Sequence, residues 1–129
     1  MREELKQPRM PASTPKKAAS QNGPVDAGIE EVIGQMQDIM WKDAGIVRTR
    51  IGMQEALKKL EELAPRVVHP RTRRAWEAAN LHLAASLVVR AALAREESRG
   101  AHYRTDYPTH DDKKFLKHSV VKGDAIRFV

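Results

Sequence analysis

Cysteine is absent from this sequence of 129 residues, which excludes disulfides, thiolate zinc sites, cysteine nucleophiles and thiolate-held iron–sulfur clusters. Aromatic residues make up only 5%, and Ala, Leu, Val, Ile and Met supply most of the apolar content, a mixture that favours helices over sheets. No apolar run approaches the roughly 20 residues that span a bilayer, and no apolar secretory signal precedes the first helix. We therefore expect a helical, cytoplasmic protein that does not enter a membrane.

The sequence also has few features that could carry chemistry. Its seven glycines are never spaced as a phosphate-binding loop requires, and Ser98 lacks the flanking glycines of a nucleophile elbow. Histidines and carboxylates near the C-terminus are residue types that bind metals, but their spacing matches no metal motif. A solvated polar loop is therefore favoured over a metal site. That group consists of His102, His110, Asp111, Asp112 and His118. We expect no catalytic, cofactor-binding or metal-binding residue in this chain.

The formal net charge of +6 raises the possibility of nucleic-acid binding, with the arginine-rich segment 66–74 as the contact. The positive residues are nevertheless spread along the chain and interleaved with carboxylates. No zinc-finger spacing or aromatic RNA-binding motif accompanies them. A solvated surface or a protein interface is therefore favoured, and a free-standing basic nucleic-acid-binding helical module is the alternative.

Residues 1–28 are predicted to form a flexible basic arm or linker, because prolines recur there among polar residues and little apolar surface can be buried. Periodic apolar residues then predict helices over 27–42 and 50–64. Those of the first helix are Ile29, Val32, Ile33, Met36, Ile39 and Met40. Those of the second are Met53, Leu57, Leu60 and Leu63. Gly45 ends the first helix and Pro65 ends the second.

A third and longest helix is predicted over 72–98, ended by Gly100. Its bulk is expected to come from Trp76, Leu83, Leu87 and Val88, while its many alanines allow close packing. Three amphipathic helices with short connections predict an all-α fold, an up-down-up three-helix bundle over residues 29–100. Residues 101–129 are assigned to an interface loop and C-terminal tail of the same domain.

The tail is expected to contain a helical turn over 115–118 and a short β-hairpin or extended segment. The hairpin strands are predicted over 119–121 and 125–129, with Lys-Gly-Asp between them. An isolated hairpin is only marginally stable in water, so this one should pack against the bundle or against a partner.

The segment Glu97–Pro108 reads Glu-Ser-Arg-Gly-Ala-His-Tyr-Arg-Thr-Asp-Tyr-Pro and follows directly after the third helix. Arginine forms bidentate pairs and tyrosine combines apolar area with a polar tip, so the mixture suits either a contact surface or an ordinary helix-to-loop junction. The residues that would make the contact are Arg99, His102, Tyr103, Arg104, Asp106 and Tyr107.

This segment resembles the C-terminal signature of the flavoprotein family that contains L-aspartate oxidase, succinate dehydrogenase and fumarate reductase. Two further stretches are similar to the family in the same order along the chain. One runs from Met40-Trp41 through Gly45–Thr49 to Glu55–Leu57, and the other is Phe115–His118. The resemblance covers about residues 29–129.

The resemblance implies a three-helix domain that packs on a flavin-binding domain or subunit of the same enzyme. FAD and the catalytic residues would then lie outside this chain, which should not turn over substrate alone. The six residues of the contact segment would serve in docking.

The choice of enzyme type within the family depends on short stretches. Met40-Trp41 with Gly45-Ile46-Val47-Arg48, and the short ending Lys122–Val129, are more similar to L-aspartate oxidase, which oxidises L-aspartate to iminoaspartate in NAD biosynthesis. Gly100-Ala101-His102 with Arg104 is more similar to succinate dehydrogenase.

Overall fold

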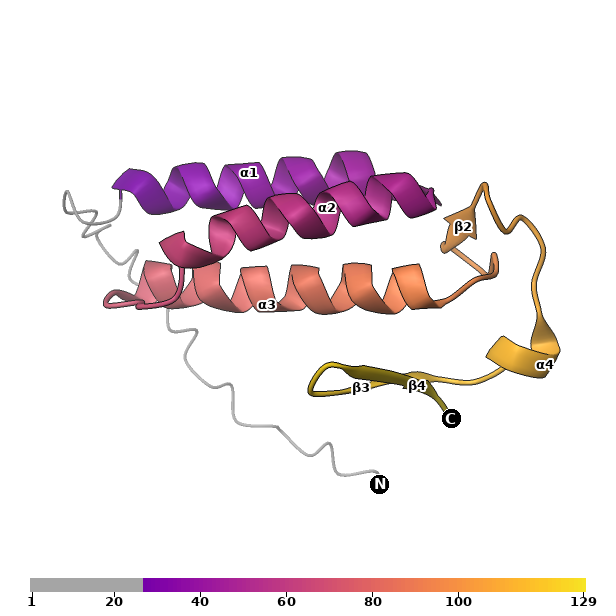
Figure 1. Ribbon diagram of the computed structural model, residues 1–129. Helices are drawn as coiled ribbons and strands as arrows, with labels where there is room; N and C mark the ends of the chain where they lie inside the picture. The colour runs from indigo at the N-terminus through magenta and orange to yellow at the C-terminus, as the bar shows by residue number, and fades with distance from the viewer. Residues whose placement is uncertain (1–26) are drawn as a thin grey trace, which may run out of the picture.

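Three helices dominate the computed structural model, which describes residues 27–129 (Figure 1). They are α1 (Ala27–Asp43), α2 (Arg50–Leu63) and α3 (Arg73–Ala94). Each contacts the other two, and the chain runs along the bundle, back and along it again (Figure 1). The all-α, up-down-up bundle is confirmed. The predicted arm lies outside the described residues, except that Ala27 and Gly28 begin α1.

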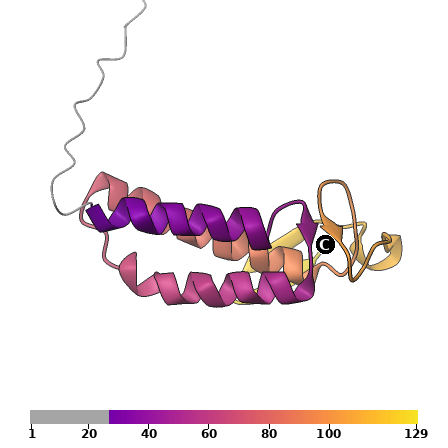
Figure 2. The ribbon, with the colours of Figure 1, turned by 90° about the horizontal axis from the view of Figure 1, so that it is seen from above.

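The core consists of side chains from the three helices and their connections, and Figure 2 shows the arrangement of the helices from above. It is built from side chains at steps of three and four along each helix, as a helix with one apolar stripe requires. From α1 and α2 these are Val32, Ile33, Met36, Met53, Ala56, Leu60 and Leu63. Removing a Leu or Met side chain of this kind from water contributes about 1.5–3 kcal/mol.

The helix α3 buries its alanines rather than its large side chains. Its buried positions are Ala75, Ala78, Ala85, Val89 and Ala92. The prediction that Trp76, Leu83 and Val88 supply core bulk is wrong, because these residues are 58%, 58% and 47% exposed. Alanines on the inner side let α1 and α2 approach the α3 backbone closely, and that leaves no space there for larger side chains.

The ends of the helices follow local hydrogen bonding. Thr49 Oγ1 accepts from the backbone N–H of Gly52 at 2.9 Å and begins α2. The helix α3 ends at Ala94 rather than at the predicted Ser98, because Arg95 already has an extended backbone (φ −83°, ψ 98°). Gly100 does not end the helix, but it has a φ of +57° in the loop, which glycine adopts without steric cost.

Two short strands that the sequence did not predict pair at one end of the bundle. The strand β1 (Val47–Arg48) lies between α1 and α2, and β2 (Tyr103–Arg104) lies in the loop after α3. They pair in parallel, with Val47 opposite Tyr103. Two-residue strands have no periodicity that sequence analysis could detect.

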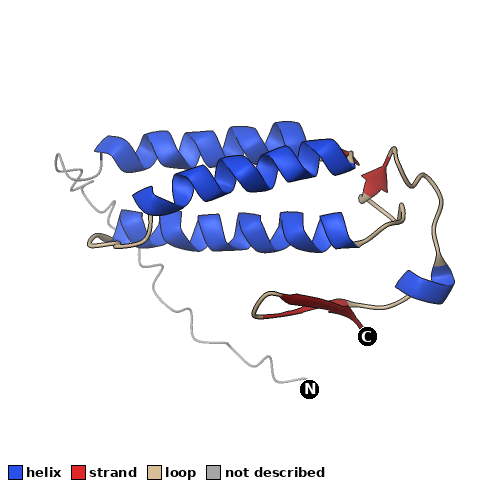
Figure 3. Ribbon diagram, in the orientation of Figure 1, coloured by secondary structure: helices blue, strands red, loops and turns tan. Residues whose placement is uncertain are grey.

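The C-terminal tail holds a helical turn and a hairpin (Figure 3). The turn is α4 (Asp112–Phe115) rather than residues 115–118, because Asp111 Oδ1 accepts from the N–H of Lys114 and begins the turn earlier. The hairpin is confirmed as β3 (Ser119–Lys122) and β4 (Ala125–Phe128). Both strands contact α3, so the hairpin packs against the bundle as expected.

Candidate interface at the end of the bundle

The loop that follows α3 is tied to the connection between α1 and α2 by backbone hydrogen bonds. The N–H of Tyr103 donates to the carbonyl of Ile46 at 3.2 Å, and the N–H of Thr105 donates to the carbonyl of Arg48 at 3.0 Å. Two segments that are far apart in the sequence therefore form one surface at this end of the bundle (Figure 1).

Arg104 is fully buried and holds the loop on the end of α3. Its Nη1 donates to the carbonyls of Leu93 at 2.8 Å and Arg95 at 3.2 Å, and so satisfies acceptors that the helix end leaves open. Its Nε and Nη2 donate to both carboxylate oxygens of Asp106. The guanidinium also lies 4.7 Å from the ring centre of Tyr107. Three of the six predicted contact residues thus form one group.

Glu97 is also fully buried and lies among positive groups. Its carboxylate accepts from Arg95 at 2.6 Å, from Arg99 at 2.9 and 3.0 Å, and from the backbone N–H of Asp111 at 2.9 Å. The hydrogen bonds from Arg99 are the main reason that the pKa of Glu97 is lowered to about 2, against the opposing effect of burial. Arg99 pairs with Asp112 as well. The carboxylate therefore stays charged inside the loop.

His102 joins the loop to β1 through its ring. Arg48 Nη1 lies 2.8 Å from Nδ1 of His102, and the carbonyl of Arg95 lies 3.1 Å from Nε2. Arginine only donates, so Nδ1 accepts and Nε2 carries the proton. Burial lowers the pKa of His102, and the neighbouring arginine charges lower it further. The neutral ring is the form that fits this site.

Exposed apolar side chains lie on the elements that meet at this end of the bundle. They come from the end of α1, the α1–α2 connection, the first turn of α2, and β2. We call these residues the bundle-end patch: Trp41, Ile46, Val47, Ile51 and Tyr103. The side chain of Trp41 is 87% exposed and that of Ile51 is 74% exposed. Val47 and Tyr103 stand opposite each other in the β1–β2 pair, and the other three residues belong to segments that lie next to β1 in the sequence. Exposed apolar side chains grouped in this way favour a contact with another protein surface.

The six predicted contact residues are thus placed unequally. Tyr103 is exposed in the bundle-end patch, and Arg99 and Asp106 are partly exposed. His102, Arg104 and Tyr107 hold the loop together. Sequence analysis missed Arg48, Arg95 and Glu97 as members of the site. In the sequence Glu97 stands close to Arg95, Arg99 and Arg104, and this was the one signal that could have indicated an internal ion cluster.

Comparison with known proteins identifies the family. The sequence model described as "Fumarate reductase flavoprotein C-term" matches residues 33–128. The chain belongs to this family.

Individual relatives agree with the assignment. The chain is 37% identical to L-aspartate oxidase of Pyrococcus furiosus over 107 residues, which cover 83% of this chain and 19% of the relative. It is 33% identical to the fumarate reductase flavoprotein subunit of Mycobacterium tuberculosis over 117 residues, covering 82% and 20%. The FrdA subunit of Escherichia coli quinol fumarate reductase is similar in structure, with a TM-score of 0.57, 28% identity, and coverage of 78% and 20%. The chain spans about a fifth of the length of these relatives.

Family membership implies a flavin, since one relative, from Methanocaldococcus jannaschii, is described as an FAD-dependent oxidoreductase. The described residues of this flavoprotein C-terminal domain do not fit FAD itself. A flavin pyrophosphate needs a glycine-rich turn whose backbone N–H groups face it at a helix start. Here the first turn of α2 follows β1, but its N–H at Gly52 is already bonded to Thr49. The arginines of the loop likewise pair with carboxylates of this chain.

The arginine-rich segment of this flavoprotein C-terminal domain is engaged in ion pairs between helices. Arg66 pairs with Glu31, and Arg74 pairs with both Glu30 and Glu77. Hydrogen bonding to Glu30 raises the pKa of Arg74, so its charge is permanent. These contacts give the segment a role in joining α1 to α3.

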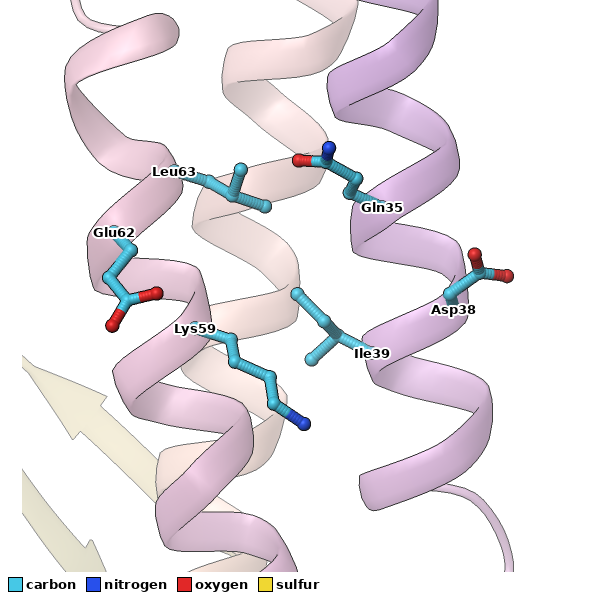
Figure 4. A pocket seen from close by; sticks show the side chains of 6 residues that line it. All are labelled: Gln35, Asp38, Ile39, Lys59, Glu62 and Leu63. Carbon is cyan, nitrogen blue, oxygen red and sulfur yellow. The ribbon is translucent and has the colours of Figure 1, made fainter.

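A groove of about 300 Å³ lies between α1 and α2 (Figure 4). Its lining residues are Gln35, Asp38, Ile39, Lys59, Glu62 and Leu63. The Lys59 ammonium pairs with Asp43 at 2.7 Å, and that bond raises the pKa of Lys59. The groove contains none of the six predicted contact residues.

Metal binding and membrane crossing are not indicated in residues 27–129. There, no group of three or more His, Asp or Glu side chains is arranged to hold a metal ion. None of the helices within the same range is long and apolar enough to cross a bilayer.

Proposed function

We propose that this chain is the C-terminal helical domain of an FAD-dependent oxidoreductase of the L-aspartate oxidase type, and that its bundle-end patch docks on a flavin-binding domain or subunit of the same enzyme. The flavin and the catalytic groups belong to that partner, so this chain has no turnover alone. The exposed bundle-end patch, which lies beside a loop held by buried ion pairs and hydrogen bonds, is the observation that supports the proposal. The enzyme is assigned to the cytoplasm, where the absence of cysteine is compatible with reducing conditions.

The chemistry of the patch supports docking. Trp and Tyr are enriched among the side chains that dominate binding energy at interfaces, and the patch contains one of each. Polar groups lie beside it, including the pair between Arg50 and Glu96 at 2.6 Å and the bond from Arg50 to the Tyr107 hydroxyl at 2.9 Å. An apolar centre with a polar rim is the usual composition of a protein interface.

The six contact residues have different roles in the proposed docking. Tyr103 contacts the partner directly, and Arg99 and Asp106 contribute the exposed parts of their charged groups. His102, Arg104 and Tyr107 act in docking through the loop, whose position they fix. This division follows from their exposure and hydrogen bonding.

Within the family, Met40-Trp41 and Gly45–Arg48 support the L-aspartate oxidase type, as does the 37% identity to the Pyrococcus furiosus enzyme. The enzyme would then oxidise L-aspartate to iminoaspartate in NAD biosynthesis. The alternative is a succinate dehydrogenase or fumarate reductase flavoprotein subunit. It is favoured by Gly100-Ala101-His102 with Arg104, and by the 33% identity to the Mycobacterium tuberculosis subunit.

The proposal is tested by expressing the affinity-tagged chain in its own cells and measuring flavin absorbance in the purified material. We expect a yellow complex with a second polypeptide, and L-aspartate should reduce its flavin. Reduction by succinate, or reoxidation by fumarate alone, would favour the alternative enzyme type. A colourless chain that purifies without a flavin-containing polypeptide would contradict the proposal.

A further inference from the structure

The ring of His102 lies between two segments that the fold brings together at the end of the bundle. On one side, Arg48 of β1 donates from Nη1 to Nδ1 of the ring at 2.8 Å, since arginine has no acceptor. On the other side, Nε2 donates at 3.1 Å to the carbonyl of Arg95, the residue that follows the last turn of α3. The ring therefore joins the α1–α2 connection to the end of α3 through two hydrogen bonds.

Arg48 is itself held from the end of α1. Its Nε donates to the carbonyl of Gly45 at 2.6 Å and to that of Ala44 at 3.2 Å. These bonds orient the guanidinium and place Nη1 against His102. The joint thus runs from the end of α1 through Arg48 and His102 to the end of α3.

The pairing of β1 with β2 depends on the same residues. The N–H of Tyr103, directly after His102, donates to the carbonyl of Ile46, and the N–H of Thr105 donates to the carbonyl of Arg48. Arg48 therefore takes part both in the strand pair and in the contact with the ring. A change at the ring acts on the strand pair through this shared residue.

A protonated ring cannot keep the contact with Arg48. Both nitrogens of a charged imidazole are donors, so the N–H at Nδ1 would meet the N–H at Nη1 of Arg48. Two positive charges would then lie within hydrogen-bond distance of one another, which is unfavourable. Burial lowers the pKa of His102 and the neighbouring arginine charges lower it further, in agreement with this geometry.

The charged groups around the ring do not compensate its protonation. The nearest are positive: Arg48 on β1, Arg95 at the end of α3 and Arg104 on β2. The carboxylates of this end of the bundle are bonded to other partners. They are Asp43 with Lys59, Glu96 with Arg50, Glu97 with Arg95 and Arg99, Asp106 with Arg104, and Asp112 with Arg99. None of these five described carboxylates bonds to the ring.

His82 shows what distinguishes this arrangement. Its Nε2 lies 2.7 Å from the carbonyl of Leu60. A carbonyl accepts from a neutral ring or from a charged one, so protonation of His82 keeps this contact. The arginine donor that faces Nδ1 makes His102 different.

We infer that His102 is a pH-sensitive switch at the end of the bundle: the neutral ring joins β1 to the end of α3, and protonation at Nδ1 opens this joint and separates β1 from β2. The three helices stay folded, because their core does not include the ring. The bundle-end patch is complete only while the ring is neutral, since Tyr103 belongs to β2. The inference goes beyond the proposed function and does not depend on it, because it concerns the free chain.

The test measures amide hydrogen exchange of Tyr103 and Thr105 in the full chain by NMR, as protection factors corrected for the intrinsic effect of pH. Both factors should fall about tenfold between about pH 7.5 and about pH 5.5. An open site with an ordinary histidine pKa of about 6.5 binds the proton that the closed site excludes. Protection in α1 and α2 should not change, and the ring should be protonated at Nε2 at the higher pH.

His102→Gln tests the ring directly. The glutamine amide does not titrate, so the protection of Tyr103 and Thr105 should not depend on pH between the same limits, whatever its level. His110→Gln is the matched control, because His110 is an exposed histidine close to His102 in sequence. That variant should keep the pH dependence of the wild type.

Four results would overturn the inference. Protection factors of the wild type that do not change between these limits would mean that the joint holds a charged ring. The wild-type pH dependence in His102→Gln would mean that another group titrates. An equal loss of protection in all three helices would mean that the whole domain unfolds. A ring protonated at Nδ1 at about pH 7.5 would contradict the contact with Arg48.

Discussion

Arg104 and Glu97 are fully buried charges of opposite sign, yet each pairs with other groups. Arg104 pairs with Asp106 and with carbonyls at the end of α3, while Glu97 pairs with Arg95 and Arg99. A buried charge is tolerated only when partners replace its lost hydration. At the scale of single residues, these groups fix the loop against the bundle end.

Arg104→Met should therefore destabilise the chain. The substitution keeps apolar volume but removes the side-chain donor of Asp106 and of the Leu93 carbonyl, and one of the two side-chain donors of the Arg95 carbonyl. We expect the free energy of unfolding to fall by about 2–3 kcal/mol, measured by urea denaturation. Arg127→Met, on the exposed side of the hairpin, is the control and should change it little. Equal stability of the two variants would show that the buried arginine is not needed for the fold.

Glu97 should give the fold a specific acid sensitivity. Its pKa falls from 4.5 to about 2 on folding, so the ionised carboxylate stabilises the native state above pH 4.5. That stabilisation is lost progressively as pH falls from 4.5 towards 2. Urea midpoints measured across this range should therefore fall less steeply for Glu97→Gln than for wild type. Parallel curves would mean that other carboxylates account for the loss of stability at acid pH.

Little of this residue-level detail was predictable from sequence. The motif Glu97–Pro108 indicated a contact surface, and that assignment stays a prediction. That Arg104 points inward depends on where α3 ends, and the helix was predicted four residues too long. With an end at Ala94 the loop must turn back over open carbonyls, and only then does a buried arginine become the expected donor.

At the scale of elements, periodicity predicted α1 and α2 almost to their ends, because each has one apolar side and a clear stop. It failed for α3, which is apolar on both sides, so the larger residues were assigned to the core in place of the alanines. The hairpin was predictable because Gly123, with a φ of +59°, stands in the turn between two apolar strands.

The hairpin should detach from the bundle without unfolding it. The rings of Phe115 and Phe128 meet edge to face at 4.8 Å, and the Arg95 guanidinium lies 5.1 Å from the Phe128 ring centre. Phe128→Ala removes both contacts, so hydrogen exchange should accelerate in residues 119–128 and stay unchanged in α1 and α2. Val120→Ala, on the exposed side of β3, should leave the hairpin protected. Faster exchange in all helices would instead make the hairpin part of one cooperative unit.

At the scale of the whole molecule, the bundle-end patch is exposed among the described residues, and alanine is the commonest residue of the core. Such a domain gains stability when a partner that binds only the folded form covers it. The family resemblance predicts such a partner, whereas the location of the bundle-end patch required the structure.

The melting temperature of the docked chain should therefore rise with the concentration of its flavin-containing partner. Mass action predicts a gain in unfolding free energy of about 2.7 kcal/mol when the free partner is at a hundred times its Kd. Scanning calorimetry of mixtures measures this directly, with serum albumin as the control protein. A melting temperature that does not respond to the partner would contradict docking to the folded domain.

The pairing of β1 with β2 also has a consequence for biosynthesis. The bundle end joins residues as far apart in sequence as Arg50 and Tyr107, 57 positions from one another. At about 5–20 residues per second, a ribosome takes about 3–11 s to travel that distance. During this interval α1 is already synthesised and α2 is being added, but the loop that orders the bundle end does not yet exist. A nascent chain therefore cannot present this finished surface to a partner until the loop after α3 has been made.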